Sequence, residues 1–332
     1  MIEITAKEFV EKTGVGEYIP VGSPYNILLP NPKTIHEKIY GTFNEKSVSF
    51  PKTFVLKIPD AMVAGEIGMA IYKDYLIVDT AIRKEFLPPM EIIDAGKNCT
   101  SISHLWARNN YFHWLISSMS RLYLLKETKI FNSEDLFIVN SINGYEIQGF
   151  LAAGLETVTP NYNKWWKCKN LTIPSPMSED AITSPIGCKF LRKSLLPKYK
   201  SEIEKIAIAR RNRGITNSTE VYGYLESIGY KVIYCEDYSF QDQIDMFNGA
   251  EYVISPHGAG LANTVFCKEG TKILEILSPL YLNACFRKIA AYSDLDYYFL
   301  LGEGEISLQE HMNSDITVDM KKLKQSLELM EG

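Results

Sequence analysis

The sequence is most constrained by a regular alternation of short apolar segments and amphipathic segments between residues 205 and 301. Apolar and β-branched runs predict strands at 205–209, 231–235, 252–255, 272–277 and 297–301. Helices are predicted between them near 218–228, 239–249 and 283–292, with a short one after the glycine-rich turn at 258–260. Such alternation implies right-handed crossovers and a parallel sheet covered by helices on both faces. The chain is therefore expected to have an α/β fold.

Local capping signals agree with this periodicity. Asn217 is followed three residues later by Glu220, and Gly229 follows the last apolar position, which is typical of a capped helix. Ser239 and Asp242 repeat the capping pattern at the start of the next helix.

The rest of the chain is less regular. Residues 1–190 contain scattered strand candidates and one long helix candidate at about 109–127. The total of 332 residues corresponds to about two domains. A C-terminal stripe recurs at spacings of four and three and needs a partner surface, on its own domain or on the N-terminal half. It consists of Ile316, Met320, Leu323, Leu327 and Met330.

Composition excludes several classes of protein. The chain has 35 Lys and Arg against 40 Asp and Glu, so its formal charge of −5 gives no electrostatic reason to expect a nucleic-acid partner. Its six cysteines are scattered without a CxxC pair, which predicts no metal site and favours free thiols in a reducing compartment. The N-terminus has no pattern typical of a signal peptide, and no stretch has the length of a membrane helix. These features favour a cytoplasmic protein.

Ligands of doubly wound sheets bind outside the carboxyl ends of the strands, and two phosphate-suited features lie there. The turn Ser255–Asn263 carries Gly258, Ala259 and Gly260 after a strand and before a helix, so backbone N–H groups could face an anion such as a diphosphate. His257 could add a hydrogen bond. Arginines at 210, 211 and 213 follow the first strand of this region and suit bidentate phosphate contacts. The alternatives are a tight structural turn and a solvated basic loop.

Glu275 is the one charged residue inside an apolar strand, where an unpaired carboxylate would be costly. It could accept hydrogen bonds from ribose hydroxyls, or pair with a nearby cation. A dinucleotide-binding function is disfavoured because no GxGxxG follows the first strand. Asp294-Leu295-Asp296 precedes a strand instead of ending one, so it is interpreted as a polar loop and not as a cation site.

A second candidate site lies on the helix predicted at 109–127. His113, Ser117 and Arg121 occur at four-residue steps and would share one face. A histidine facing a cleft suits a general base, because its pKa is near working pH. The alternative is a structural histidine. His104 and Trp106 lie just upstream and could line the same cleft.

The region from about 100 to 325 resembles glycosyltransferase family 61. The resemblance rests on Ala209-Arg210-Arg211, Ser239–Gln243, His257–Asn263 and Leu274-Glu275-Ile276, with the run Asn110–Leu115 and Arg121 upstream. It implies a GT-B fold of two Rossmann-like domains facing a cleft, with a C-terminal helix that crosses back to the N-terminal domain. The implied domains are 1–195 for the acceptor, 196–312 for the nucleotide sugar, and 313–332 for the closing helix.

The resemblance also implies an inverting transferase without an essential metal or other cofactor. His113 is the candidate base, and Arg210 is the candidate stabiliser of the leaving diphosphate. The donor contacts are expected at Arg210, Arg211, His257, Gly258, Ala259, Gly260, Asn263 and Glu275. The acceptor side is expected at Asn110, Trp114 and Arg121.

The expected partners are a nucleotide diphosphate sugar, UDP-linked, and a glycan or glycolipid acceptor. The chain is similar to bacterial members that act in the cytoplasm, at the inner face of the membrane, in capsule or lipopolysaccharide synthesis. The alternative is a nucleotide-binding scaffold or regulator that kept the fold and lost the chemistry.

Overall fold

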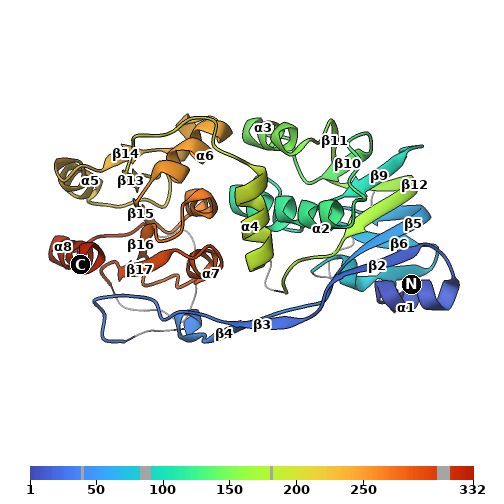
Figure 1. Ribbon diagram of the computed structural model, residues 1–332, viewed down its shortest axis with the longest axis horizontal. Helices are drawn as coiled ribbons and strands as arrows, with labels where there is room; N and C mark the ends of the chain where they lie inside the picture. Colours follow the sequence, from blue (N-terminus) through green and yellow to red (C-terminus); the bar gives the residue numbers. More distant parts are fainter. Residues whose placement is uncertain (39–40, 83–90, 180–181, 305–314) are drawn as a thin grey trace. The chain divides into compact units, whose positions relative to one another are not determined.

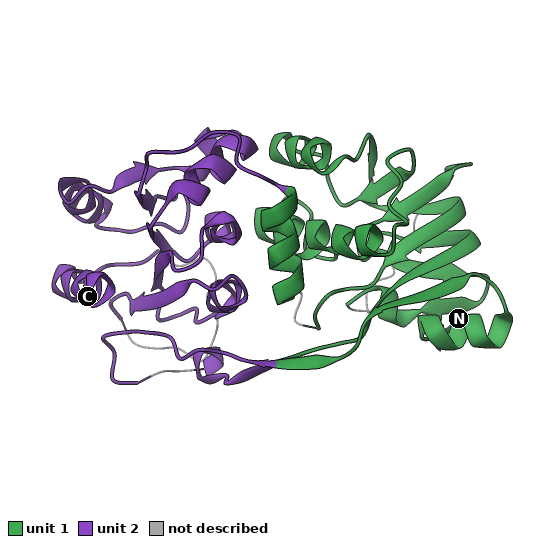
Figure 2. Ribbon diagram, viewed as in Figure 1, with its two compact units in different colours: residues 1–26, 49–194 green, residues 27–48, 195–332 purple. Residues whose placement is uncertain are grey.

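A computed structural model describes residues 1–38, 41–82, 91–179, 182–304 and 315–332. The chain forms two compact units (Figure 2): unit 1 comprises residues 1–26 and 49–194, and unit 2 comprises 27–48 and 195–332. Both units combine helices and strands, which confirms the α/β class (Figure 1). Within the described ranges, no helix has the length and apolar content needed to cross a membrane.

Unit 2 is built on a parallel sheet. Its strands are β13 (Lys205–Ile208), β14 (Lys231–Ile233), β15 (Tyr252–Pro256), β16 (Lys272–Leu277) and β17 (Asp296–Leu301). They lie in the order β14-β13-β15-β16-β17, and all four neighbouring pairs are parallel. The predicted parallel sheet is therefore confirmed. The chain order reverses between β13 and β15, and this switch point is where doubly wound sheets bind ligands.

Helices cover both faces of this sheet (Figure 1). One face carries α5 (Ser218–Ser227) and α8 (Met320–Glu331); the other carries α6 (Phe240–Gly249), α7 (Cys285–Tyr292) and the 3₁₀ helix η6 (Ala259–Phe266). A further short 3₁₀ helix, η5, spans Cys235–Asp237. The predicted capping box of Ser239 and Asp242 forms at the start of α6.

Asn217 is the N-cap residue of α5, as predicted, and its carbonyl oxygen accepts from the backbone N of Glu220 and Val221. The predicted capping by its side chain is wrong. Its side chain makes no cap hydrogen bond to α5. Instead, its Oδ1 accepts from the Val318 backbone N at 3.0 Å, and its Nδ2 donates to the Val318 carbonyl at 2.9 Å. The amide thus fastens the C-terminal segment, a long-range contact that local spacing does not reveal.

The predicted crossing of the C-terminal helix to the N-terminal half is also wrong. Leu323, Leu327 and Met330 of α8 are buried in a core cluster of unit 2, together with Val221 and Leu225 of α5. The apolar stripe is real, but its partner surface is the sheet of its own unit. The predicted boundary between residues 312 and 313 lies outside the described residues.

Unit 2 also contains residues 27–48, a stretch that the sequence analysis assigned to the N-terminal half. This stretch holds the 3₁₀ helix η1 (Gly41–Asn44), and strands β3 (Tyr25–Leu28) and β4 (Ser47–Phe50) pair at its ends. The Lys33 backbone bonds to Tyr297 and Phe299 beside β17. The buried Arg287 guanidinium donates to three carbonyl oxygens of the stretch, including that of Phe43 at 2.9 Å. Backbone pairing and a buried cation therefore hold it in unit 2.

Unit 1 contains a mixed sheet in the order β1-β7-β6-β5-β12-β9-β10-β11, with β2 on β5 and β8 on β12. The strands are β1 (Ile2–Ile4), β2 (Glu17–Gly22), β5 (Thr53–Ala64), β6 (Met69–Tyr72), β7 (Tyr75–Ile77), β8 (Glu91–Asp94), β9 (Asn98–Ser101), β10 (Leu136–Val139), β11 (Thr157–Pro160) and β12 (Lys164–Pro174). The strands β12, β9, β10 and β11 form a parallel series, and β8 also runs parallel to β12 and β1 to β7. In contrast, β5 runs antiparallel to β12, β6 and β2. The Rossmann-like expectation thus fits only the parallel part of the unit 1 sheet.

The long helix predicted at about 109–127 is divided into three. A π-helix, η3 (His113–Ser118), is followed by a 3₁₀ turn, η4 (Met119–Arg121), and then by α2 (Leu122–Glu127). The other helices of unit 1 are α1 (Ala6–Thr13), α3 (Gly144–Ala153), α4 (Pro185–Ser194) and the 3₁₀ turn η2 (Val78–Thr80). π-Helices are rare and often occur at functional sites, so the break at His113 marks this segment.

Candidate active site

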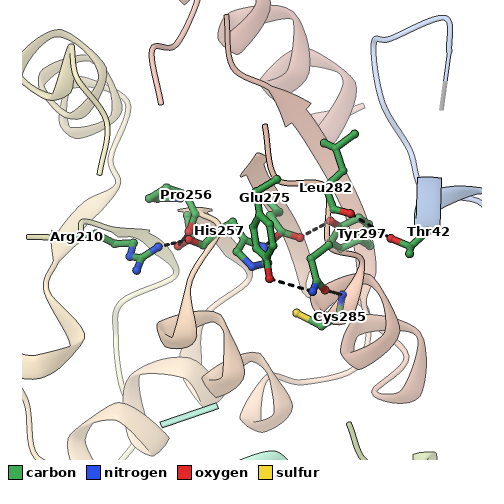
Figure 3. Close-up of polar contacts among 11 residues, drawn as sticks. Thr42, Arg210, Pro256, His257, Glu275, Leu282, Cys285 and Tyr297 are labelled. Carbon is green, nitrogen blue, oxygen red and sulfur yellow. Dashed lines mark hydrogen bonds and ion pairs between the residues drawn. The ribbon is translucent and has the colours of Figure 1, made fainter. Parts of the chain in front are cut away.

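The two phosphate-suited features of unit 2 meet at the switch point of its sheet. Arg210 follows β13, and His257 follows β15, the strand beside it. The Arg210 Nη1 atom donates a hydrogen bond to the His257 carbonyl oxygen (Figure 3). A Cβ at Gly258 would lie 2.5–2.7 Å from three atoms of the guanidinium. The guanidinium therefore lies directly against the turn, and a side chain at position 258 would have to displace it.

Arg210 carries a partly desolvated charge. Burial, reinforced by nearby Arg213, lowers the pKa of its guanidinium to about 10, so the group stays positive at neutral pH. A desolvated cation without a full counter-charge gains most from a bound anion. The environment of Arg210 thus suits a phosphate better than a solvated arginine would.

Three side chains behind the turn form a continuous hydrogen-bonded chain. His257 Nδ1 lies 2.5 Å from Oε1 of Glu275, and the other oxygen of Glu275 accepts from the Tyr297 hydroxyl (Figure 3). Glu275 is completely buried in the middle of β16. Burial, and then the adjacent Glu275, raise the pKa of Tyr297 well above its usual value, so its hydroxyl remains a donor.

This arrangement corrects the role expected of Glu275. The sequence predicts a carboxylate at the strand end, exposed to ribose hydroxyls. In the structure the side chain has no solvent exposure, and both oxygens are bonded within unit 2. The ribose contact expected of Glu275 is therefore wrong, because no ribose can reach a fully enclosed carboxylate.

Two aromatic rings pack against the His257 ring, and a small part of the His257 side chain stays exposed to solvent. Its ring centroid lies 5.2 Å from that of Tyr281 and 5.1 Å from that of Phe286, both at steep angles. The side chain is 14% exposed, and no hydrogen bond in the described part of the chain uses its Nε2 atom. The fixed ring therefore offers Nε2 to a ligand at the turn.

The rest of the turn is held in place by contacts with other residues of unit 2. A Cβ at Gly260 would lie 3.1 Å from the Cys235 sulfur, so the backbone packs closely there. Ala259 is the first residue of η6. Asn263 is fully buried, and its Nδ2 donates to Gln243 Oε1 at 2.7 Å and to the Gly260 carbonyl at 3.1 Å. The direct phosphate or sugar contact predicted for Asn263 is therefore not available to this amide, which shapes the turn instead.

Arg211 points its guanidinium at acidic side chains. Nη2 donates to both carboxylate oxygens of Asp237 at 2.8 Å, and Nη1 lies 2.8 Å from Glu236. These hydrogen bonds raise the pKa of Arg211. The three predicted arginines thus differ, because Arg210 meets the turn whereas Arg211 is held in surface ion pairs.

The DxD string also has ordinary partners. Asp296 forms a 2.8 Å ion pair with Lys33, and the Asp294 carbonyl accepts from the Gly270 backbone N at 2.8 Å. Because Asp296 begins β17, only Asp294 and Leu295 lie in the loop before the strand.

The second candidate site is centred on His113 in unit 1. Its Nδ1 lies 3.1 Å from the Ser117 hydroxyl, which confirms that these two residues share a face. The ring stacks on His104 with a centroid distance of 5.4 Å and an angle of 16°, and lies 5.4 Å from the Trp106 ring. Trp106 is 37% exposed and places an aromatic surface beside the half-buried imidazole.

His104 is the deeper of the two stacked rings. Burial, followed by the nearby His113 and Arg121, lowers its pKa well below the usual value, so His104 is neutral at neutral pH. Its Nε2 atom is buried and has no hydrogen-bond partner within the described residues. A neutral His104 ring opposes a positive charge on the neighbouring His113 ring less strongly than a protonated His104 ring would.

Of the three residues expected on the acceptor side, Arg121 and Trp114 are buried. Arg121 is 1% exposed, and its guanidinium donates to the carbonyl oxygens of Ser103 and Pro174. Trp114 is 2% exposed and packs against aromatic rings of α3. Asn110 Oδ1 accepts from the His113 backbone N at 3.4 Å at the start of the helical segment. The acceptor role is wrong for Arg121 and Trp114 because both are enclosed in the core of unit 1.

Sequence reasoning missed Tyr297. It lies in an apolar and aromatic strand, and nothing local separates it from its neighbour Tyr298. The one available signal is the pairing of strands: a charged Glu275 on β16 requires a polar partner, and β17 lies directly beside it.

Comparison with known proteins gives the class. A sequence model described as Glycosyltransferase 61 matches residues 111–274, a range that contains His113, Arg210 and the whole His257–Asn263 turn. The protein is a glycosyltransferase enzyme. Over these residues it belongs to glycosyltransferase family 61. No curated protein matches the sequence.

Proposed function

We propose that the protein is an inverting glycosyltransferase that moves a hexose or pentose from a nucleotide diphosphate sugar, UDP-linked, to a hydroxyl group of a glycan or glycolipid. The acceptor would belong to a surface polysaccharide such as capsule or lipopolysaccharide. The proposal includes a GT-B type arrangement, with unit 2 binding the donor and unit 1 binding the acceptor.

The observation that carries this proposal is the meeting of Arg210 with the His257–Gly258 turn. A guanidinium, an imidazole nitrogen and a glycine-rich backbone converge at the switch point of a parallel sheet. These are the groups that recognise phosphate oxygens, at the place where doubly wound sheets bind ligands. A diphosphate therefore suits the turn in charge and in position.

The proposed reaction is a single in-line displacement. The acceptor oxygen forms a bond to the anomeric carbon as the bond from that carbon to the diphosphate oxygen breaks, which inverts the configuration. The acceptor proton passes to the His113 imidazole, which acts as general base. The exposed ring of Trp106 beside it offers the apolar face of a sugar a stacking surface.

Negative charge grows on the leaving diphosphate as the bond breaks. Arg210 and the Nε2 atom of His257 would stabilise this charge, and preorganised donors of this kind typically contribute 10²–10³-fold in rate. Since these groups are supplied by the chain itself, the proposal needs no essential metal.

The proposed setting is the bacterial cytoplasm, at the inner face of the membrane where a lipid-linked acceptor is held. None of the six cysteines, all of which lie in the described part of the chain, forms a disulfide bond, which fits a reducing compartment. Association with the membrane would then occur through the acceptor.

A panel of nucleotides and nucleotide sugars tests the proposal on the full chain. We expect UDP and one UDP-sugar to raise the melting temperature, and that sugar to release UDP when a glycan acceptor is added. Arg210→Ala should reduce both effects, with Lys205→Ala at the far end of β13 as the matched loss of a positive charge. No stabilisation by any nucleotide would contradict the donor assignment.

A further inference from the structure

We propose that Glu66, Arg108 and Tyr162 of unit 1 form a subsite that binds a neutral sugar through two adjacent hydroxyl groups. The bound sugar is the one next, along the acceptor chain, to the sugar that receives the transferred group. The inference rests on the proposed function for the role of this sugar as part of the acceptor. It deepens that function, because it makes the acceptor an oligosaccharide or a longer glycan.

The three side chains contact one another and are partly exposed. The guanidinium carbon of Arg108 lies 3.2 Å from the centroid of the Tyr162 ring, so the planar cation covers one face of the phenol. Arg108 Nη1 lies 3.4 Å from Glu66 Oε1, which is longer than a typical hydrogen bond and leaves donors and acceptors of the pair for a ligand. The side chains of Arg108 and Glu66 are 37% and 27% exposed, and Tyr162 is 43% exposed. The cluster is thus an assembled polar surface that a ligand can reach.

Three loops meet at this subsite: the turn between β5 and β6, the loop after β9, and the turn between β11 and β12. Buried asparagines hold them together. Asn161 is fully buried, and its Nδ2 donates to the Gly65 carbonyl oxygen and to Ser103 Oγ. Asn140 Nδ2 donates to the Glu66 carbonyl oxygen at 2.8 Å. The subsite is therefore preorganised, which lowers the entropy cost of binding a sugar.

The subsite continues the surface beside the candidate base. Arg108 follows Trp106 by two residues, so their Cα atoms are at most about 7 Å apart. Ala107 between them is buried, and its backbone N donates to the His104 carbonyl oxygen at 2.9 Å, so the loop turns and exposes both neighbours. The ring centroids of Trp106 and His113 are 5.4 Å apart. A sugar stacked on Trp106 thus has the next sugar of its chain within reach of Arg108.

The pairing of a cation with a carboxylate selects the kind of sugar. The guanidinium donates hydrogen bonds and the carboxylate accepts them, so two adjacent hydroxyl groups can bond to both members of the pair. A carboxylate or phosphate on the ligand would be attracted by Arg108 but repelled by the Glu66 carboxylate beside it. The exposed part of Tyr162 adds apolar surface for the C–H bonds of the sugar. These groups therefore favour a neutral sugar over a uronic acid or a sugar phosphate.

Glycan binding in the absence of a nucleotide sugar tests the subsite. Ligand-observed NMR titrations of the full chain would use neutral tetrasaccharides of glucose, galactose, mannose, xylose and N-acetylglucosamine, with tetragalacturonate as the acidic counterpart. We expect at least one neutral tetrasaccharide to bind. Arg108→Lys should weaken this binding about tenfold, because lysine keeps the charge but lacks the planar fork that bonds to two hydroxyls. No binding of any neutral tetrasaccharide, or tighter binding of tetragalacturonate, would overturn the inference.

Two further substitutions keep the test decisive if Arg108→Lys does not fold. Tyr162→Ala removes the ring under the guanidinium and should weaken binding of the neutral tetrasaccharide several-fold. Glu66→Gln removes the negative charge and should improve the binding of tetragalacturonate relative to the neutral sugar. An unchanged preference in Glu66→Gln would mean that Glu66 does not select the ligand, and parent-like binding in Tyr162→Ala would remove the ring from the subsite.

Lys57→Ala is the matched control, since Lys57 of β5 pairs with Glu17 at 3.7 Å elsewhere on the unit 1 sheet. It removes a surface ion pair away from the subsite and should leave glycan binding unchanged. Melting curves of all variants separate binding from stability. Equal losses of binding in Lys57→Ala and Arg108→Lys, or a loss in Arg108→Lys that follows a large drop in melting temperature, would assign Arg108 a structural role and overturn the inference.

Kinetics then separate the subsite from the reaction. With an oligosaccharide acceptor, Arg108→Lys should raise the acceptor KM about tenfold with a smaller change in kcat, and should leave the KM for the UDP-sugar unchanged. The methyl glycoside of the terminal sugar does not extend to the subsite, so its KM should change much less. Equal changes for the two acceptors would overturn the subsite but leave the proposed function in place. Conversely, a parent that binds neutral tetrasaccharides through Arg108 and releases no UDP would contradict the proposed function and retain the sugar-binding subsite.

Discussion

His257 in unit 2 and His113 in unit 1 have opposite surroundings. His257 faces the enclosed carboxylate of Glu275 at 2.5 Å. His113 faces the Ser117 hydroxyl at 3.1 Å and stacks on a second imidazole, that of His104. A carboxylate stabilises an added proton, whereas a second imidazole does not. The two histidines are thus prepared for different tasks.

The difference lies in what holds each ring. In unit 2, Nδ1 of His257 is anchored on the buried Glu275, and no hydrogen bond among the described residues uses its Nε2 atom. In unit 1, burial, followed by the nearby His113 and Arg121, keeps His104 neutral at neutral pH. The proposed reaction assigns the two rings different tasks, His257 at the leaving diphosphate and His113 at the acceptor hydroxyl.

The largest expected effect comes from removing the candidate base. His113→Ala should reduce turnover by about 10²–10⁴-fold, because the acceptor proton then has no positioned acceptor. Affinity for UDP should stay unchanged, since the donor groups belong to unit 2. Turnover and UDP binding, measured on the same preparation, check this. Ser117→Ala, which removes only the hydroxyl beside Nδ1, should cost less, and parent-like turnover in His113→Ala would assign the base elsewhere.

Arg210→Ala should reduce turnover by about 10²–10³-fold and also weaken UDP binding, because a preorganised cation at the leaving group is lost. Arg211→Ala is the matched control, since its guanidinium is bound to Asp237 and Glu236 on the surface. We expect Arg211→Ala to change turnover by no more than a few-fold. Melting curves of both variants establish that the fold is intact. Similar losses in the two variants would remove the distinction drawn between these arginines.

The sheet of unit 2 could be predicted because its signals are local. Each strand is a short apolar run, the Ser239–Asp242 box marks a helix start, and the glycine turn follows a strand directly. Such features depend on spacing within about ten residues. The same spacing placed Arg210 and His257 at the carboxyl edge, where the structure joins them.

The predictions that were wrong depend on contacts between residues that are far apart in the sequence. The burial of Glu275 depends on Tyr297, which lies on the neighbouring strand, and the use of Asn217 depends on Val318, about a hundred residues away. Periodicity gave α8 its apolar face but not the surface that it covers. Arg121 fits an exposed polar face in sequence, yet the structure buries it against two carbonyl oxygens, because the helix changes type after His113.

Gly258→Ala tests the unit 2 side with a smaller change. An added Cβ would lie 2.5 Å from Arg210 Nη1, so the guanidinium must move from the turn. We expect about a tenfold loss of turnover with the fold intact. Gly223→Ala is the control, since its Cβ would meet nothing within 4 Å on α5 and should stabilise the helix slightly. If both variants have the turnover of the parent, the close approach of Arg210 to Gly258 does not contribute to turnover.

The smallest effect concerns stability and tests the neutral state of His104. Its pKa is held well below that of an unfolded histidine, so below about pH 6.5 the unfolded chain binds a proton that the folded chain does not. Stability must therefore fall as pH decreases, by about 1 kcal/mol from this group between pH 7 and pH 5.5. His36 in unit 2, whose pKa is also lowered by burial, adds a contribution of the same sign. Urea unfolding of the parent and of His104→Phe at both pH values isolates the unit 1 contribution. An equal loss of stability in the two proteins would mean that His104 titrates in the folded chain.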